Sequence, residues 1–594
     1  MSGSDRTISP KELPQLAEGT LPLIKAGVLA PMGPVAMGKA LKSIVQWSFT
    51  PAGLLALGAA QDPYHTAILD DAGSITYSEL NDQTDKLAEA LYRTGVRERD
   101  KIGMLSRNHR GFIMTLCAHG RLGTDIVLFN TGASASQTRA VMKEQKIDLL
   151  FIDEEFIPLL PKGFDECPVI VNWEENQDTA AAPLTEEEKA KRADAGYDVI
   201  EYASNVAEAT ADEDHATRNP EWPSLTEVLR TGPADTKIPP RPRRGRTIIL
   251  TSGTTGTPKG ARRPEPKTYL PASSIMSRIP LKHHRGYYVP APMFHLWGFC
   301  QIQLGLALRA TFILQRKFNP RDAVKLIEAN RPANIAIVPT QLRRLLEAVP
   351  EKFNPGTKSI VACGEALPAR VIRDTHEKFG KVLYNLYGST EVSWASIATP
   401  EELDAHPTTA GKAPMATTLK VVDDDGNDVP EGTVGRVFVG NDLLFEGYTR
   451  PGVDKENLRG LVSTGDLGYF EDGLFYLAGR SDDMIVSGGE NVYPQEAEDV
   501  IADMPEVYEV AVHGVADPEF GQALAAYVVL KDDATREGFQ DRAKAAVKAN
   551  LARHNVPRYY VFMDVLPRNA VGKIVPRELP KIDTGMDDSP ETAA

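Results

Sequence analysis

Cysteines are few and long apolar runs are absent in this chain of 594 residues. Its four cysteines, Cys117, Cys167, Cys300 and Cys363, lie far apart, so the sequence lacks the paired spacing of a zinc site or a disulfide framework. No apolar run reaches the roughly 18 to 20 residues that cross a bilayer, and no basic start precedes an apolar segment at the N-terminus. We therefore expect a reducing, cytoplasmic setting, with no zinc, signal peptide or transmembrane helix.

Basic residues are also fewer than acidic ones. The chain has 66 basic and 81 acidic residues, a formal net charge of −15, which argues against a general nucleic-acid-binding protein. The hydrophobic fraction of 42% at this length is sufficient for two or three domains, each with its own core. These bounds predict a large globular protein whose anionic ligands are small.

A loop rich in hydroxyl groups and glycine, TSGTTGTPKG at residues 251–260, directly follows the apolar run 247–250. Its glycines let the backbone approach an anion, its hydroxyls donate hydrogen bonds, and Lys259 adds a mobile positive charge. A Walker-type loop does not fit, because Pro258 stands where the second glycine belongs and Gly260 follows the lysine. The segment predicts phosphate binding, and a polar surface turn is the alternative.

Short apolar runs alternate with helical stretches from about residue 61, where Thr76 and Glu79 predict a capping box. Such alternation is typical of an α/β fold with doubly wound, mostly parallel sheets. The acidic segment 174–214 is expected to be a surface excursion. The predicted strands are 101–105, 126–129, 148–152, 247–250, 287–289, 311–314, 334–338, 359–362 and 382–386.

The whole chain divides by composition into four parts. Residues 1–60 form an apolar, proline-interrupted N-terminal arm, in which Met37, Leu41, Ile44 and Val45 follow helical spacing. We expect this arm to pack on the protein's own surface, with membrane contact as the alternative. A large domain would span 61–480 and include a distorted β subdomain at 415–480, followed by a small, mobile α+β domain at 481–580 and a disordered tail at 581–594.

Short motifs recur at wide intervals after the phosphate loop. Those after apolar strands would lie at the carboxyl edge of a parallel sheet, where ligand sites of α/β proteins collect. The motifs are Gly364–Pro368, Tyr387–Glu391, Ser463–Asp466, Tyr476–Arg480, Ser481–Asp483, Ser487–Glu490 and Pro567–Lys573. In this order the motifs resemble the adenylate-forming superfamily of acyl-CoA synthetases, luciferases and peptide-synthetase adenylation domains. The resemblance covers about 61–580 and is nearest to actinobacterial fatty acyl-CoA synthetases.

The resemblance implies a two-step reaction in which a carboxylate attacks the α-phosphate of ATP, releasing pyrophosphate, and a thiol then displaces AMP. Mg²⁺ would bridge phosphate oxygens and be held by Glu391. The ATP phosphates would contact Thr251, Ser252, Gly253, Thr254, Thr255, Gly256 and Lys259. Adenine and ribose would contact Gly364, Glu365, Ala366, Tyr387, Gly388, Ser389, Thr390, Asp466 and Arg480.

The resemblance assigns Lys573 to the first step, where its ammonium would neutralise charge at the forming acyl-phosphate bond. Asp482 would be the hinge about which the small domain rotates between the two steps. Rotation would bring Ser487, Gly488 and Gly489 toward the CoA thiol. His295, in the segment PMFHLWG, would separate the acid pocket from the thiol channel, although a core histidine is the alternative. The residues expected to be catalytic are Lys573, Glu391, Thr251 and His295.

The presumed acid pocket holds Trp297, Gly298, Phe299 and Gly305 and offers no charged anchor for an amino acid. The interpretation is therefore a CoA ligase for a medium- to long-chain fatty acid, with ATP, Mg²⁺ and coenzyme A as cofactors. Alternatives are an aromatic or branched acid, a fatty acyl-AMP ligase that serves a carrier protein, and a non-catalytic adenylate-binding protein. A homo-oligomer, peripheral contact with the inner membrane surface, and the role of Arg262 and Arg263 stay open.

Overall fold

The computed structural model describes residues 13–29, 33–175, 219–231, 238–251, 258–351, 353–487, 490–531, 534–568 and 574–582. Several predictions lie outside these ranges: most of the acidic excursion, the tail from residue 583, the loop 252–257, and Gly488, Gly489 and Lys573. Within the described part of the chain, no helix is long and apolar enough to cross a membrane.

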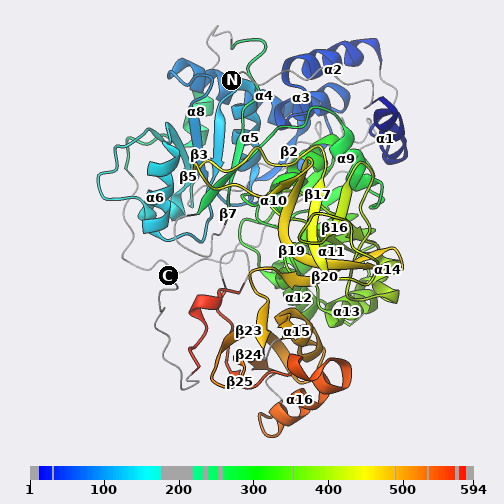
Figure 1. Ribbon diagram of the computed structural model, residues 1–594. Helices are drawn as coiled ribbons and strands as arrows, with labels where there is room; N and C mark the ends of the chain where they lie inside the picture. Colours follow the sequence, from blue (N-terminus) through cyan, green and yellow to red (C-terminus); the bar gives the residue numbers. More distant parts are fainter. Residues whose placement is uncertain are drawn as a thin grey trace.

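Two largely parallel sheets form the large domain (Figure 1). One has eight strands in the order β14-β13-β12-β11-β9-β10-β1-β2, and the other has six in the order β6-β5-β3-β4-β7-β8. The edge strands β2, β14 and β8 pair antiparallel with their neighbours. The eight-stranded sheet contains β1 (Thr66–Asp70), β2 (Gly73–Thr76), β9 (Gly286–Tyr288), β10 (Thr311–Ile313), β11 (Asn334–Ile337), β12 (Ser359–Cys363), β13 (Leu383–Tyr387) and β14 (Ser396–Ala398). The six-stranded sheet contains β3 (Lys101–Leu105), β4 (Asp125–Leu128), β5 (Leu149–Asp153), β6 (Val169–Trp173), β7 (Thr247–Thr251) and β8 (Lys259–Arg263).

Helices cover these sheets because the strands are apolar on both faces. In β4, for example, Ile126, Val127 and Leu128 are all fully buried. The predicted capping box exists at the start of α4, where Thr76 and Glu79 exchange hydrogen bonds. The helical elements of the large domain beyond the arm are α3 (Pro51–Gln61), α4 (Tyr77–Arg93), α5 (Arg110–Leu122), α6 (Ala135–Gln145), η1 (Glu154–Leu159), α8 (Leu225–Arg230), α9 (Leu270–Met276), α10 (Leu296–Ala307), α11 (Pro320–Asn330), α12 (Pro339–Ala348), α13 (Ala369–Phe379) and α14 (Pro400–Ala405).

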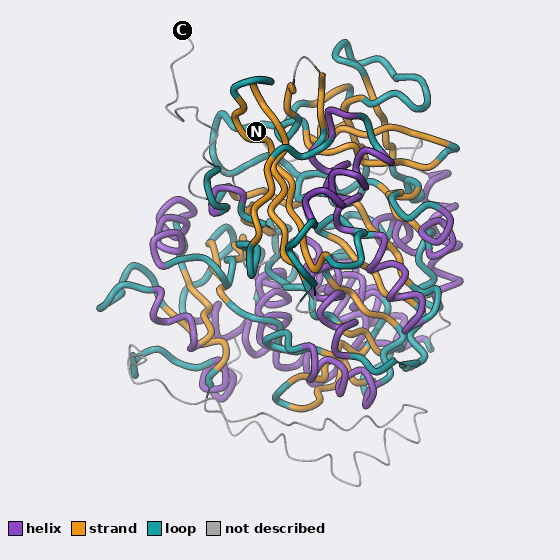
Figure 2. The backbone as a smooth tube through the Cα atoms, turned by 90° about the horizontal axis from the view of Figure 1, so that it is seen from below, coloured by secondary structure: helices purple, strands orange, loops and turns teal. Residues whose placement is uncertain are grey.

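Antiparallel strands then form a third sheet. Figure 2, with strands in orange and helices in purple, shows the mixed α/β composition of the molecule. It contains β15 (Thr409–Gly411), β16 (Thr418–Val422), β17 (Gly435–Gly440), β18 (Asn457–Leu458), β19 (Leu461–Glu471) and β20 (Leu474–Arg480). The small C-terminal domain follows, built on a fourth sheet. Its elements are β21 (Ile485–Ser487), β22 (Glu490–Val492), α15 (Pro494–Ala502), β23 (Val507–Asp517), β24 (Gly521–Leu530), α16 (Phe539–Asn550), η2 (Arg553–Asn555), β25 (Tyr559–Phe562) and η3 (Pro576–Glu578). The predicted fold class is confirmed.

The N-terminal arm is helical. It comprises α1 (Leu13–Ala26) and α2 (Pro34–Trp47), and α3 follows directly. Pro34 and Pro51 stand at the first turns of α2 and α3, where a missing N–H costs no hydrogen bond. These prolines therefore start helices rather than interrupt them.

Candidate functional site

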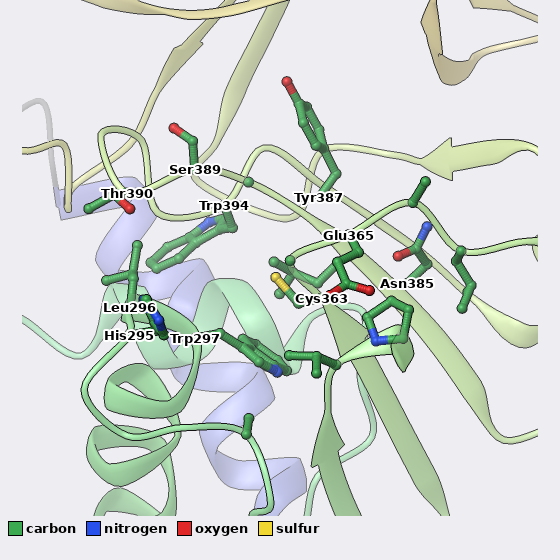
Figure 3. A pocket seen from close by; sticks show the side chains of 18 of the residues that line it. His295, Leu296, Trp297, Cys363, Glu365, Asn385, Tyr387, Ser389, Thr390 and Trp394 are labelled. Carbon is green, nitrogen blue, oxygen red and sulfur yellow. The ribbon is translucent and has the colours of Figure 1, made fainter. Parts of the chain in front are cut away.

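A cavity of about 2540 Å³ opens at the carboxyl ends of strands of both large sheets, between the β subdomain and the small domain. This volume exceeds the roughly 300 to 1000 Å³ of a single small-molecule site, so it has room for more than one ligand. Figure 3 shows part of its wall. The cavity is lined by the predicted site residues Thr251, Lys259, His295, Gly364, Glu365, Ala366, Tyr387, Gly388, Ser389, Thr390, Glu391, Asp466, Arg480 and Asp482.

The two ends of the phosphate loop are fixed by strand pairing. Thr251 ends β7 and faces Lys259, the first residue of β8, and the Thr251 hydroxyl donates to the Lys259 carbonyl at 3.2 Å. The Lys259 ammonium lies 5.9 Å from the centroid of the Tyr448 ring. The roles predicted for residues 252–257 stay predictions.

Glu391 is held by two hydroxyl groups. Ser389 donates to its Oε2 at 2.8 Å, and Tyr448 donates to its Oε1 at 2.6 Å. Burial raises the pKa of Tyr448, and the Glu391 carboxylate raises it further, so the phenol stays protonated and donates. The turn before them requires glycine, since a Cβ at Gly388 would lie 2.1 Å from the Ser393 carbonyl oxygen.

The surroundings of Glu391 suit Mg²⁺. This cation binds through one or two carboxylates and completes its coordination with phosphate oxygens and water. Glu391 supplies one carboxylate at the cavity wall, and the residue is only 9% exposed. The Lys259 ammonium lies near the same Tyr448 ring whose hydroxyl holds this carboxylate. Glu391 is thus the residue that would hold the metal.

Arg263 has a structural contact that the sequence analysis did not assign. Its buried guanidinium donates to the Thr390 carbonyl at 2.7 Å and also to Ser393 and the Leu443 carbonyl. It therefore braces the loop that carries Glu391. Arg262, in contrast, is exposed, and neither arginine lines the cavity.

Asp466 and Tyr387 form the opposite wall. The Tyr387 hydroxyl donates to Asp466 Oδ2 at 2.5 Å, and Asp466 pairs across strands with Arg480. Burial raises the pKa of Tyr387 well above its usual value, and Asp466 adds to the shift, so Tyr387 remains a donor. One oxygen of Asp466 is therefore fixed, which orients the carboxylate toward a ligand.

The segment after β12 turns sharply at Gly364, where φ is +107°, a conformation that favours glycine. Thr340, at the start of α12, donates to Glu365 Oε2 at 2.6 Å and accepts from Arg568 at 3.4 Å. This contact ties the predicted adenine segment to the small domain.

His295 precedes α10, and its ring centroid lies 4.3 Å from that of Phe294. The helix starts tightly, since a Cβ at Gly298 would lie 2.2 Å from the Pro292 carbonyl oxygen. Figure 3 shows His295, Trp297 and Trp394 around the same part of the pocket, and all three line the cavity. The gating role of His295 stays a prediction.

The small domain presents one of its two predicted functional segments to the cavity. Arg568 and Ile574, which flank Lys573 in sequence, form an isolated bridge and both line the cavity. Ser487 is buried, pairs with Gly521 and Glu490, and is absent from the cavity wall. The arrangement therefore brings the flanks of Lys573, rather than Ser487, to the site.

Sequence reasoning missed the residues that position the ligands: Tyr448, Arg263, Thr340 and, as a contact, Arg568. Only Arg568 lay inside a recognised motif, Pro567–Lys573. The other three act through hydrogen bonds to partners 25 to 180 positions away in sequence, so no local pattern marks them.

Comparison with known proteins identifies the family. The profile of the AMP-binding enzyme family matches residues 55–449, and that of the AMP-binding enzyme C-terminal domain matches residues 496–573. Indoleacetate–CoA ligase of Aromatoleum aromaticum is 28% identical over 527 residues, covering 87% of this chain and 94% of its own. 2-Succinylbenzoate–CoA ligase of Bacillus licheniformis is 27% identical over 522 residues, covering 87% and 97%.

Solved structures show the same fold. The anthranilate CoA ligase AuaEII with anthranoyl-AMP has a TM-score of 0.74 at 21% identity, covering 90% of this chain and 97% of its own. o-Succinylbenzoate CoA synthetase from Bacillus subtilis, in complex with ATP and magnesium ion, has a TM-score of 0.69 at 23% identity, covering 89% and 98%. The expectation of ATP, Mg²⁺ and CoA agrees with what these relatives are named for or contain. This chain belongs to the AMP-binding enzyme family.

Proposed function

We propose that this protein is an AMP-forming acid–CoA ligase. A carboxylate oxygen of the acid attacks the α-phosphorus of ATP and expels pyrophosphate. The CoA thiol then attacks the acyl carbonyl, loses its proton, and expels AMP to give the thioester. The observation that supports this most is the convergence of Lys259, Glu391, Asp466 and the flanks of Lys573 on one cavity.

Each group has a task that follows from its contacts. Lys259 and Thr251 stand at the two ends of the phosphate loop, where they would neutralise and bind the departing pyrophosphate. Asp466, fixed through one oxygen by Tyr387, would accept hydrogen bonds from the ribose hydroxyls. Mg²⁺, when bound at Glu391, would offset the negative charge of the phosphate oxygens.

Lys573 acts in the first step, and rotation of the small domain prepares the cavity for the second. With the flanks of Lys573 at the cavity, the arrangement is suited to adenylate formation, because an ammonium placed there stabilises charge on the acid and the α-phosphate together. Rotation about Asp482 would then replace Lys573 with the Ser487–Gly489 turn for thioester formation.

An aromatic acid is the substrate class that the relatives favour, since their names specify indoleacetate, succinylbenzoate and anthranilate. The pocket suits a flat ring. Trp297 is held by a hydrogen bond from its indole N–H to the Ile337 carbonyl at 3.2 Å, and the Trp394 indole donates to Thr417 at 2.9 Å. Two fixed aromatic faces can stack on a ring.

A fatty acid is the second candidate, in line with the resemblance to actinobacterial fatty acyl-CoA synthetases, and one observation favours it. The cavity does not end at the tryptophans but continues along α10 to the N-terminal arm. Its wall there is mainly apolar: it includes Leu304, Ala307, Ile275, Phe49, Ile44, Leu41 and Met37, together with the polar side chains of Gln61, Gln301 and Gln303. This extension suits an alkyl chain.

A split assay tests the function and the substrate class together. The protein is incubated with ATP and Mg²⁺, with and without CoA, and with a panel of aromatic and straight-chain acids from acetate upward. Pyrophosphate and thioester are recorded separately. Thioester with aryl acids supports the first class, and a window of long alkyl acids supports the second. Pyrophosphate without thioester would indicate that the acyl acceptor is a carrier protein rather than CoA. No product from any acid would contradict the proposal.

A further inference from the structure

Large apolar side chains are exposed on the N-terminal arm. Seven of the fourteen strongly exposed large hydrophobic residues in the described chain fall between positions 21 and 45. They are Leu21, Ile24, Leu29, Val35, Met37, Leu41 and Val45. Single exposed apolar residues are ordinary on a protein surface, but such a concentration marks an interaction site. We call these seven residues the arm face.

The arm face is outward because other sides of both helices are attached to the domain. In α1, Leu23 and Ala26 are buried, and α9 donates hydrogen bonds at 2.8 Å from Tyr269 to the Leu16 carbonyl and from Ser273 to the Gly19 carbonyl. In α2, Ala40 and Ser43 are buried, and the Arg121 guanidinium lies 5.2 Å from the Trp47 ring centroid. Figure 1 shows both helices, in dark blue, at the rim of the molecule.

The charge around the arm face differs in sign from that of the whole chain. Residues 13–47 contain three lysines and one glutamate, whereas the chain carries a net charge of −15. Lys25, Lys39 and Lys42 are all exposed, and α2 has no acidic residue. Apolar side chains interspersed with lysines are typical of helices that lie in the headgroup region of an anionic bilayer.

Part of the arm face also borders the cavity. Leu29, Met37 and Leu41 are each exposed and also line the cavity. From there the wall continues through Ile44 and Phe49 toward the pocket that contains His295. An apolar molecule that enters between these side chains would reach the predicted acid site without crossing the polar nucleotide cleft.

We propose that the arm face docks on an anionic lipid surface and that the apolar acid enters from it between Leu29, Met37 and Leu41. A second copy of the chain suits this face less well. A symmetric dimer would bring Lys25, Lys39 and Lys42 of both copies, six positive charges, into one interface, to which residues 13–47 of each copy contribute only one glutamate. The lysines favour a partner of negative charge, and phospholipid headgroups supply it together with an apolar interior.

Sedimentation of the full chain with vesicles tests the docking, in the absence of ATP and CoA. We expect binding to phosphatidylcholine vesicles that contain roughly one-third phosphatidylglycerol, weaker binding to pure phosphatidylcholine, and loss of binding at high salt. The double variant Ile24→Ser/Val45→Ser, with one exposed arm-face residue changed on each helix, should bind about tenfold more weakly. Equal sedimentation of the wild type and the double variant would overturn the proposal.

A matched pair of variants controls for a general effect of removing apolar groups from the surface. Val35 in the arm is 75% exposed and Val565 in the small domain is 70% exposed, so Val35→Ser and Val565→Ser remove the same group at similar exposure. Only Val35→Ser should weaken vesicle binding. Molecular mass in solution is measured for each variant, and a wild-type dimer that Val35→Ser dissociates, without vesicle binding, would assign the face to a second copy instead.

Entry of the acid at this face rests on the proposed function, so it is measured separately from docking. Long-chain acid embedded in anionic vesicles should be converted at least several-fold more slowly by Ile24→Ser/Val45→Ser, whose two positions lie outside the cavity wall, while a short, water-soluble acid should be converted at the wild-type rate. Vesicle binding without any conversion would leave docking intact and contradict the proposed function. Equal conversion of both acids by both proteins would contradict entry at the arm.

Discussion

Side chains outside the recognised motifs position those inside them. Tyr448 and Ser389 fix both oxygens of Glu391, Tyr387 fixes one oxygen of Asp466, and Arg263 holds the loop that carries Glu391. Such contacts orient ligands for a metal or nucleotide and determine how well charge is matched in the transition state. They make two substitutions informative.

Tyr448→Phe removes only the hydroxyl that donates to Glu391. We expect the rate of pyrophosphate release at limiting ATP and Mg²⁺ to fall about tenfold, because one charge-assisted hydrogen bond is lost and Glu391 can turn. Raising Mg²⁺ should restore part of the rate. Tyr469→Phe, at a tyrosine on β19 outside the cavity wall, is the control. An unchanged Mg²⁺ dependence in Tyr448→Phe would contradict this role.

The substitution Arg263→Met tests whether Arg263 stabilises the loop that carries Glu391. The substitution removes the guanidinium that donates to the Thr390 carbonyl and to Ser393, and it leaves the Leu443 carbonyl with the Ser393 hydroxyl as its donor. We therefore expect the free energy of unfolding of the large domain to fall by about 2 to 4 kcal/mol. Arg262→Met changes an exposed arginine next to it and should alter stability by less than about 0.5 kcal/mol. Denaturant titration measures the free energy of unfolding of both variants. Equal effects of the two substitutions would show that Arg263 does not stabilise this loop.

Many of the residues that line the cavity could be selected from the sequence, because glycines, hydroxyl side chains, lysine and carboxylates at the ends of parallel strands are typical of phosphate and nucleotide sites. The residues that hold the site loops through long-range hydrogen bonds could not be predicted. Arg263 contacts carbonyls 127 and 180 positions away, and such partners are set by the tertiary fold alone.

At the scale of elements, the nine predicted strands of the large domain are confirmed to within one residue at each end. Their apolar runs are unambiguous because both faces are buried. The division into two sheets could not be predicted, since it depends on which strands pair. For example, β4 and β7 are neighbours although more than 100 residues separate them. The strands β1, β2, β6, β8 and β14 were not predicted, and length is not the reason, since β9 and β10 have only three residues each. The edge strands β2 and β8, with the sequences GSIT and KGARR, lack an apolar run.

A cluster of histidines attaches the end of α1 to the domain. His283 contacts the Ala26 carbonyl at 2.9 Å, and Arg309 donates to the Val28 carbonyl at 3.2 Å. His284 pairs with Asp62 at 2.9 Å, and its ring lies tilted against that of His65 at a centroid distance of 4.7 Å. The pKa of His65 is lowered to about 3, mainly by burial; His284, Arg309 and His283 contribute to the lowering, and Asp62 opposes it.

This cluster predicts acid sensitivity of the arm. A histidine whose folded pKa lies below its unfolded value of 6.5 binds fewer protons when folded, so its stabilising contribution is present above pH 6.5 and is lost as pH falls toward 3. From about pH 7 to about pH 5, His65 alone should cost about 2 kcal/mol of stability. Hydrogen exchange of α1 and thermal unfolding should show this loss, and His65→Gln should reduce the slope. Identical pH profiles for the two proteins would exclude His65 as its source.

On the scale of the whole molecule, ion pairs hold the small domain against the large one. From the large domain, Arg343 pairs with Glu509 of β23 and Arg373 pairs with Asp503 at 2.6 Å, and Arg568 of the small domain shares Glu509 with Arg343. Charged contacts of this kind are weaker than an apolar interface and can be exchanged during rotation. The predicted reuse of one cavity for two steps requires such an interface.

Lys573→Ala tests the division of labour between the domains. The variant should lose adenylate formation by at least about a hundredfold, because charge neutralisation at the reacting phosphate is lost. It should still convert supplied acyl-adenylate and CoA to thioester near the wild-type rate. Lys548→Ala, at an exposed lysine on α16, is the control for both steps. Equal loss of both steps in Lys573→Ala would refute a role confined to the first step.

The most direct test of the account follows one oxygen atom. The acid is labelled in its carboxylate with a heavy oxygen isotope and converted with ATP, Mg²⁺ and CoA, and the AMP is analysed by mass spectrometry. Because a carboxylate oxygen attacks the α-phosphorus and remains there when the thiol displaces AMP, we predict one labelled oxygen in AMP and none in pyrophosphate. Label in inorganic phosphate, or thioester formed with unlabelled AMP, would contradict an acyl-adenylate intermediate.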